Sequence, residues 1–338
     1  MKFKFLHWKY VVVLVVVFVL GYGTNTLFVA TLLPVNASVE TEPTLRETGK
    51  YQFIAPLLLC ASYENTNLKQ ESSLESQVQS LVDSEIRAGK ATGISVYLRG
   101  FKGKWVGVNE NDQYIPASLL KVPLMIAYFK EAETNPAILT KTLRYDGSFD
   151  DNQAEEFRST NDIKPGSYKV IDLIQSMIED SDNNATRLLD ADIDPKVLAS
   201  VYTDLGLTLP ADDGVNVKVI SAKQYSYFFR ILYNATYLKP EYSEKALEFL
   251  TAIDFPQGLE ATVPSNVPVA NKFGERSVFT PTGDVIERDL HDCGLVYARK
   301  EGPYLLCIMT KGKNFKDLTD VIQSIGKFVY NKGSAITQ

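Results

Sequence analysis

The chain has 338 residues, of which 45% are hydrophobic and 22% charged, with a formal net charge of −6. This composition is typical of a folded protein with a sizeable core and excludes collagen, complete disorder and a polytopic membrane protein. The negative net charge provides no basic surface for nucleic acid. The three cysteines, Cys60, Cys293 and Cys307, are odd in number and widely spaced, so they predict neither a disulfide framework nor a zinc site.

The N-terminal part of the chain carries a membrane signal. Three lysines precede an apolar stretch over residues 10–33, which predicts one transmembrane anchor or, alternatively, a long signal segment cleaved after Ala37. Acidic residues follow the stretch, so the positive-inside rule places residues 1–9 in the cytoplasm and the remainder outside. Residues 34–72 are expected to form a linker and an arm that packs on the folded part.

Patterns of strand and helix then alternate along the chain. A helix is expected over 74–86, followed by strands over 93–98 and 105–109. Helical patterns without a convincing strand occupy 119–133, 170–179, 184–189, 221–237 and 243–253. Strands return over 267–273, 290–299 and 304–310, before a closing helix over 315–330.

These elements predict an α/β (α+β) fold in which both ends of the chain contribute to one antiparallel sheet flanked by helices. The sheet and its helices form an α/β subdomain from residues 73–117 and 266–338. Residues 118–265 form an inserted, all-helical subdomain.

The first chemical motif is Ser118-Leu119-Leu120-Lys121, an S-x-x-K. Residues three apart share one face of a helix, so the hydroxyl and the amine can touch. A serine needs an adjacent base, and a lysine serves when burial lowers its pKa enough to leave it neutral. The alternative is a helix N-cap with a surface lysine one turn on. The same pattern recurs at Ser324–Lys327, where ordinary solvated helix residues explain it better.

Two further motifs follow in the chain. Ser181-Asp182-Asn183 precedes a helical run and also fits a helix-capping turn. Lys272-Phe273-Gly274 lies on the first C-terminal strand, where a lysine that opposes edge-to-edge aggregation is the alternative explanation.

In this order, S-x-x-K, S-D-N and K-x-G resemble the signature of class A beta-lactamases and penicillin-binding proteins. The resemblance covers roughly residues 74–330. It implies that Ser118 is the nucleophile and that Lys121 is its general base. Ser181 would relay a proton to the leaving nitrogen, and Asn183 would hold Lys121 and the amide of the ligand.

The resemblance also assigns roles to the C-terminal strand. Lys272 would supply positive potential for a substrate carboxylate and keep Lys121 neutral, with Gly274 on the same substrate-binding strand. The backbone N–H groups of Ser118 and Glu275 would form the oxyanion hole. Two lysines facing one pocket are expected to attract anions.

The chain departs from the family pattern at two places. Phe273 replaces the usual threonine or serine, whose hydroxyl helps to bind the substrate carboxylate, and Arg276 is a candidate substitute on the same strand face. Class A enzymes carry a water-activating glutamate after the S-D-N helix, but no glutamate occurs between Asn183 and Glu241. The nearby carboxylates are expected to be surface turn residues: Asp204, Asp212 and Asp213. Acylation is therefore expected to outrun hydrolysis.

The leading hypothesis is a membrane-tethered serine hydrolase that opens beta-lactams through an acyl-enzyme on Ser118. A D-alanyl-D-alanine carboxypeptidase or transpeptidase acting on a peptidoglycan stem peptide would use the same motifs. A catalytically silent module that binds cell wall or beta-lactam is the third possibility. The sequence contains no nucleotide loop or metal-ligand cluster, so neither a cofactor nor a metal is expected. His291 is expected in a turn at the start of a strand, in a structural hydrogen bond.

Overall fold

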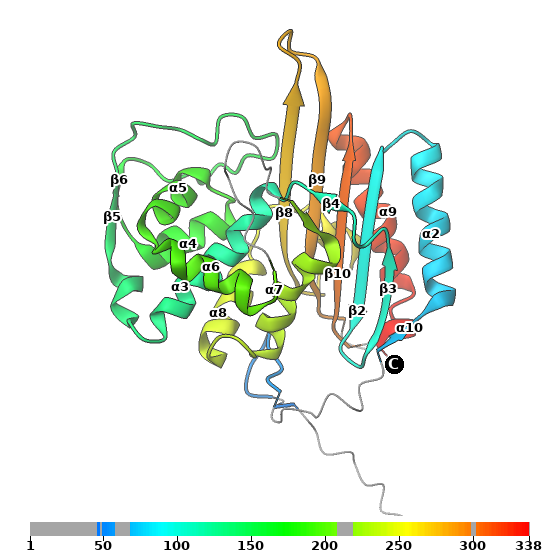
Figure 1. The fold of residues 1–338 in the computed structure, drawn as a ribbon, viewed down its shortest axis with the longest axis horizontal. Helices are drawn as coiled ribbons and strands as arrows, with labels where there is room; N and C mark the ends of the chain where they lie inside the picture. The colour runs from blue at the N-terminus through cyan, green and yellow to red at the C-terminus, as the bar shows by residue number, and fades with distance from the viewer. Residues whose placement is uncertain (1–45, 48, 58–67, 208–218, 299–301, 338) are drawn as a thin grey trace, which may run out of the picture. The chain divides into compact units, whose positions relative to one another are not determined.

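The computed structural model describes residues 46–47, 49–57, 68–207, 219–298 and 302–337 (Figure 1). The predicted tail over 1–9, the apolar segment over 10–33 and Cys60 lie outside these residues. In the described part of the chain, no helix has the length and apolarity needed to cross a bilayer.

One sheet of six strands forms the centre of the fold, in the order β1-β3-β2-β10-β9-β8. Its strands are β1 (Lys69–Gln70), β2 (Gly93–Gly100), β3 (Lys104–Val108), β8 (Val269–Phe279), β9 (Val285–Val296) and β10 (Tyr304–Gly312). The N-terminal strand β2 pairs antiparallel with the C-terminal strand β10. The predicted sheet from both ends of the chain is therefore confirmed, although the short β1 runs parallel to β3.

Helices α2 (Ser72–Arg87), α9 (Phe315–Asn331) and α10 (Ser334–Thr337) accompany the sheet, and α2 and α9 lie together on the right in Figure 1. The apolar residues of α9 recur every three or four positions and are fully buried: Leu318, Val321, Ile322, Ile325 and Val329. That spacing gives a helix one apolar stripe, and each such side chain contributes about 1.5–3 kcal/mol when buried. Asn314 caps the first turn by accepting the N–H of Lys316.

A second group of helices lies to the left of β8 and in front of the sheet in Figure 1. Its α-helices are α3 (Lys121–Ala132), α4 (Val170–Glu179), α5 (Asn183–Asp192), α6 (Pro195–Asp204), α7 (Ala222–Asn234) and α8 (Pro240–Leu250). The 3-10 helices among the described residues of this region are η1 (Ala117–Leu120), η2 (Pro136–Thr140) and η3 (Leu259–Thr262). Helix α6 was not predicted from the sequence. Its start is nevertheless marked by typical residues, because Asp194 caps it and Pro195 occupies its first turn.

The expectation that no strand interrupts this region was wrong. Strand β4 (Gln113–Tyr114) pairs with β7 (Ile220–Ser221), and β5 (Thr142–Tyr145) pairs with β6 (Gly166–Lys169). Strands of two to four residues are too short to show an alternating pattern. The division into subdomains over 73–117, 118–265 and 266–338 stays a prediction.

Residues 46–47 and 49–57, which are part of the predicted linker and arm over 34–72, contact helices α7 and α8. The carboxylate of Glu244 on α8 accepts the backbone N–H groups of Gln52, Phe53 and Ile54 at 2.7–3.1 Å. Arg46 donates to Oδ1 of Asn234 at 2.8 Å, at the end of α7. Both contacts tie the arm to the two helices.

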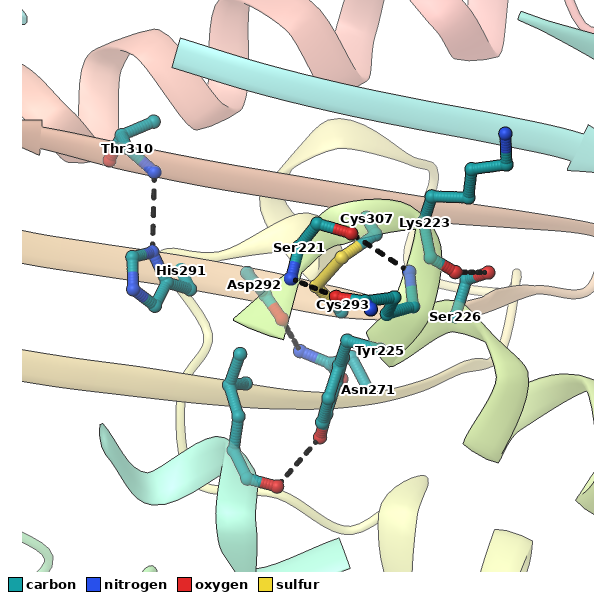
Figure 2. Close-up of a disulfide and its surroundings, with 12 residues drawn as sticks. Ser221, Lys223, Tyr225, Ser226, Asn271, His291, Asp292, Cys293, Cys307 and Thr310 are labelled. Carbon is teal, nitrogen blue, oxygen red and sulfur yellow. Dashed lines mark hydrogen bonds between the residues drawn. A yellow bond between two sulfur atoms is a disulfide. The ribbon is translucent and has the colours of Figure 1, made fainter. Parts of the chain in front are cut away.

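The structure corrects the interpretation of the cysteines. Cys293 on β9 and Cys307 on β10 lie directly opposite each other and form a disulfide (Figure 2). Both are fully buried. The pairing depends on the register of the two strands, which cysteine spacing alone does not reveal.

The structure also corrects the position of His291, which lies within β9 and not in a turn, because that strand already begins at Val285. Its Nδ1 accepts the N–H of Thr310 at 3.2 Å (Figure 2), so Nε2 carries the proton and donates to the carbonyl of Ile115 at 3.0 Å. Complete burial lowers the pKa of His291 to about 4. The expected structural hydrogen bond is present.

Candidate active site

Ser118 lies on η1, the turn that leads into α3. The preceding residue, Ala117, has a left-handed backbone with φ of +49°, a conformation that non-glycine residues rarely adopt. The hydroxyl of Tyr225 on α7 donates to the carbonyl of Leu119 at 3.0 Å and braces the turn (Figure 2). The predicted helix from 119 therefore starts as a tight turn, and α3 begins only at Lys121.

Gly274 allows strand β8 to approach this turn. A Cβ atom at position 274 would lie 2.7 Å from the carbonyl oxygen of Pro116 and 3.2 Å from the backbone nitrogen of Leu119. Real Cβ atoms essentially never come within 3.0 Å of another heavy atom, so the contact with Pro116 allows only glycine unless the turn shifts. The glycine of the K-x-G motif thus places the edge of the sheet beside Ser118.

Lys121 and Lys272 meet at Ser181. The Nζ atom of Lys121 donates to the carbonyl oxygen of Ser181 and, at 3.0 Å, to its hydroxyl oxygen. The Nζ atom of Lys272 donates to the same hydroxyl oxygen at 2.9 Å. The structure therefore brings together one residue from each of the three motifs.

Burial controls the protonation of both lysines. Lys121 is 3% exposed and Lys272 is fully buried. Burial lowers the pKa of Lys121 to about 8, although nearby carboxylates raise this pKa. Burial lowers the pKa of Lys272 well below its usual value, and the charge of Lys121 lowers it further. Burial thus favours the neutral form of both lysines, which is the state that a general base requires.

Asp182 and Asn183 connect this cluster to the loop between β5 and β6. The carboxylate of Asp182 caps α5 by accepting the N–H of Ala185 at 2.9 Å, and it accepts the N–H of Ile163 at 2.7 Å. The Nδ2 atom of Asn183 donates to Oε1 of Glu155 at 2.7 Å. The amide that was expected to hold Lys121 therefore holds a glutamate that the sequence interpretation did not include.

A cavity of about 490 Å³ opens beside these groups. Its wall includes five of the predicted site residues: Ser118, Lys121, Asn183, Glu275 and Arg276. The other lining residues are Ala117, Leu120, Leu124, Asp151, Ala154, Glu155, Thr186, Asp190, Leu198, Tyr202, Ser277 and Phe279. The predicted nucleophile, its predicted base and three of the four predicted binding residues thus share one cavity.

A family model described as "Beta-lactamase enzyme family" matches residues 73–332. The chain belongs to the beta-lactamase enzyme family. A comparison with curated protein sequences found no match.

Solved structures of this family share the fold. A mutant of PBP-A, in an acyl-enzyme complex with penicillin G, is 20% identical with a TM-score of 0.64, covering 78% of this chain and 97% of that one. A class A beta-lactamase from Mycobacterium abscessus is 19% identical with a TM-score of 0.61, covering 75% and 98%. The TLA-3 extended-spectrum beta-lactamase is 16% identical with a TM-score of 0.65, covering 77% and 99%.

Phe273, where the beta-lactamase pattern has a hydroxyl, belongs to an aromatic cluster. Its ring stacks on Phe255 with centroids 4.2 Å apart and meets Phe157 edge-on at 6.4 Å. The side chain is 2% exposed. The side chain of Phe273 is therefore part of the core and offers no hydrogen bond to a ligand.

Arg276, the candidate substitute for that hydroxyl, is engaged with carboxylates of β9. Its Nη1 atom lies 2.9 Å from Oδ2 of Asp289 and 3.9 Å from Oε1 of Glu287. The residue lines the cavity, but these ion pairs already balance its charge. Its role toward a substrate carboxylate stays a prediction.

The charges of the cavity wall differ from the expected ones. The lining cations of the described chain are Lys121 and Arg276, whereas the lining acids are Asp151, Glu155, Asp190 and Glu275. Lys272 is fully buried and favours its neutral form. The pocket was expected to attract anions because only the lysines were considered. The acidic residues that line the cavity outnumber the cations, so this expectation does not hold for the cavity wall.

Sequence reasoning missed Glu155 and the side-chain role of Glu275. The carboxylate of Glu275 accepts the backbone N–H groups of Glu156 and Phe157 at 3.0 and 2.9 Å. Glu155 lies in a polar loop without periodicity, so no sequence signal marked it. Asp204 was expected to be a surface turn residue; it is exposed, but it is the last residue of α6 and not part of a turn. Positions 212 and 213 lie outside the described residues.

Proposed function

We propose that the chain is a serine hydrolase of the beta-lactamase type that opens beta-lactam amide bonds through an acyl-enzyme on Ser118. The observation that carries this proposal is the hydroxyl of Ser181 bonded to both Lys121 and Lys272, at the cavity that Ser118 lines. The PBP-A mutant of the same fold, which is described as an acyl-enzyme complex with penicillin G, supports a beta-lactam as ligand.

Acylation proceeds in the proposal by proton transfers among these groups. Neutral Lys121 takes the proton of Ser118, whose oxygen attacks the lactam carbonyl. The backbone N–H groups of Ser118 and Glu275 stabilise the oxyanion. Ser181 then donates its proton to the leaving nitrogen as the C–N bond breaks, and the proton that Lys121 holds returns to Ser181.

Ligand binding uses two other groups in the proposal. Asn183 holds the side-chain amide of the ligand, for which its own amide offers both a donor and an acceptor. Lys272 supplies a hydrogen-bond donor to Ser181 at 2.9 Å and so orients the proton relay. No metal or cofactor takes part in these steps.

The fate of the acyl-enzyme separates the leading function from its alternatives. No glutamate occurs between Asn183 and Glu241, which favours slow hydrolysis and thus a D-alanyl-D-alanine carboxypeptidase or transpeptidase acting on stem peptides. Phe273 lacks the hydroxyl that the family uses to bind the substrate carboxylate, which favours a catalytically silent binding module.

Mass spectrometry of the Ser118 peptide distinguishes the three functions. Full-length protein is incubated with penicillin G and sampled over time. A transient adduct supports the beta-lactamase, a persistent adduct supports the penicillin-binding type, and the absence of any adduct contradicts both. Ser118→Ala must abolish the adduct, whereas Ser324→Ala, in the second S-x-x-K on α9, must retain it.

We further propose that residues 10–33 anchor the chain in a membrane with the catalytic part outside the cytoplasm. The disulfide between Cys293 and Cys307 supports this location, because such bonds persist mainly in oxidising compartments. Cell fractionation tests it. The full chain is expected in the membrane fraction and accessible to protease added outside, and recovery from the cytosol contradicts the proposal.

A further inference from the structure

His291 is a buried side chain that the proposed catalytic steps leave unused. It lies within β9 and is fully buried. It lies directly opposite Gly274 on β8, and residues opposite each other in antiparallel strands project from the same face of the sheet. His291 therefore faces the same way as the glycine that lets the sheet approach the turn of Ser118.

Both ring nitrogens of His291 have a defined partner. Nδ1 accepts the N–H of Thr310 on the neighbouring strand β10 at 3.2 Å (Figure 2). Nε2 donates to the carbonyl oxygen of Ile115, three residues before Ser118, at 3.0 Å. Burial lowers the pKa of His291 to about 4, so at neutral pH the ring is uncharged and carries its one proton on Nε2. The ring thus links the sheet to the segment that leads into the nucleophile.

The two residues directly before Ser118 restrict what the backbone of the turn can do by itself. Pro116 has no N–H group to donate. Ala117 has the left-handed φ of +49°, and a residue other than glycine keeps such a conformation only where its surroundings impose it. The conformation of the turn therefore depends on contacts from other elements.

Other elements hold the turn on both sides of Ser118. On the following side, the hydroxyl of Tyr225 on α7 donates to the carbonyl of Leu119 at 3.0 Å (Figure 2). On the preceding side, His291 donates to the carbonyl of Ile115. An attacking oxygen must lie in line with the carbonyl that it attacks, and a displacement of about 1 Å can cost roughly 100-fold in rate. The two contacts therefore bear on the rate of acylation.

We propose that His291 is a positioning residue for the nucleophile: by donating to Ile115, it holds the turn in the conformation that aims Ser118 at the acyl carbonyl. This inference rests on the proposed function, in which Ser118 attacks a lactam. Among the described residues, those that line the cavity do not include His291, so it acts through the turn. Only its bond to Ile115 reaches the nucleophile, whereas its bond to Thr310 stays within the sheet.

Two substitutions at position 291 each keep one of the two hydrogen bonds. In His291→Gln the amide nitrogen takes the place of Nε2 and donates to Ile115, because the two atoms lie equally far along their side chains. In His291→Asn the amide oxygen takes the place of Nδ1 and accepts the N–H of Thr310 for the same reason. Both variants lose the ring and neither carries a charge, so the pair isolates the bond to Ile115.

Acylation by benzylpenicillin is followed by intact-protein mass spectrometry with the full-length chain at pH 8, where part of Lys121 is neutral. The rate constant at saturating penicillin is expected to fall about 100-fold in His291→Asn and to stay within about fivefold of the wild type in His291→Gln. The concentration for half-saturation is expected to stay within about twofold, because the cavity wall is unchanged. Equal rate constants in the two variants, a slower His291→Gln, or a loss confined to half-saturation overturns the proposal.

Ile325→Ala is the control for a general loss of stability. Ile325 is fully buried on α9 and is not among the described residues that line the cavity, and its truncation lowers the free energy of unfolding by leaving a cavity. Urea unfolding compares it with both variants at position 291. Ile325→Ala is expected to acylate at the wild-type rate. If its rate falls as much as that of His291→Asn, the loss in His291→Asn follows from stability alone and the proposal is overturned.

Hydrogen exchange separates this inference from the proposed function. If benzylpenicillin does not modify Ser118 in the wild type, the acyl-enzyme function fails, but the turn can still be measured. The N–H of Leu119 donates to the carbonyl of Pro116 at 3.1 Å, and its exchange reports opening of the turn. In a peptide covering 115–121, exchange is expected to be about tenfold faster in His291→Asn than in the wild type and unchanged in His291→Gln. Equal exchange in the two variants overturns the role of His291.

Discussion

Lys121 and Lys272 donate hydrogen bonds to the same oxygen atom, the hydroxyl of Ser181, at 3.0 and 2.9 Å. Two ammonium groups this close, both buried, repel each other and lack solvent. The arrangement therefore favours loss of a proton from the cluster, and it leaves the proton of the Ser181 hydroxyl available to a leaving group. It is the structural basis for the predictions on catalysis below.

Replacing Lys272 by methionine is expected to lower the acylation rate about 100-fold to 1,000-fold, because Ser181 loses an orienting donor and the site loses a potential positive charge. The free energy of unfolding is expected to stay unchanged or to rise, since a buried amine is replaced by an apolar chain of similar size. Penicillin adduct formation and urea unfolding measure the two effects.

Lys164→Met is the control for this variant, because Lys164 heads another K-x-G sequence but is exposed. It is expected to acylate at the wild-type rate. If Lys272→Met also retains that rate, Lys272 takes no part in the proton relay.

The acylation rate is expected to rise with pH and to level off above about pH 8. Lys121 must be neutral to accept the proton of Ser118, and burial lowers its pKa to about 8. Between pH 6 and 7 the neutral fraction, and with it the rate, increases about tenfold. Stopped-flow or quenched mass measurements across this range give the profile.

The same profile is expected to move to lower pH in Glu155→Gln. The negative charge of Glu155 raises the pKa of Lys121, so its removal lowers that pKa and makes the base neutral at a lower pH. A midpoint that moves upward, or a profile that falls with pH in the wild type, would contradict Lys121 as the base.

Phe273→Thr introduces the hydroxyl of the family pattern and is expected to destabilise the protein by about 3 kcal/mol. The change removes a fully packed ring and its stack on Phe255, and loss of a buried phenylalanine typically costs about 3–5 kcal/mol. Phe279→Thr removes a ring that is 51% exposed on the same strand, and a loss below about 1 kcal/mol is expected there. Denaturant titration compares them, and equal losses would show that the aromatic cluster contributes no stability.

Replacing both Cys293 and Cys307 by serine is expected to lower the free energy of unfolding by about 3 kcal/mol. The disulfide closes a loop with a sequence separation of 14, for which the chain-entropy model gives this magnitude. The reduced wild type should show a similar loss when unfolded in the presence of dithiothreitol. Unfolding midpoints that do not depend on reductant would mean that the bond does not form in the protein.

Much of the fold followed from sequence periodicity. The apolar spacing of α9 and the nearly continuous apolar runs of β2 and β10 depend only on neighbours within one element, so the sequence predicted these elements with errors of a few residues at the ends. The short strands β5 and β6 were not predicted from the sequence, because each is defined by its pairing with the other strand and not by a pattern within its own four residues.

The sequence by itself determined the three motifs and the kinds of side chain that serve them: a hydroxyl with an amine one turn away, a second hydroxyl and a second amine. Only the tertiary structure decided the partners. Glu155 meets Asn183, and Cys293 meets Cys307, because loops and strand register bring together residues that no local pattern links. Contacts of this kind depend on the packing of the whole chain, and the charge of the cavity depends on them too.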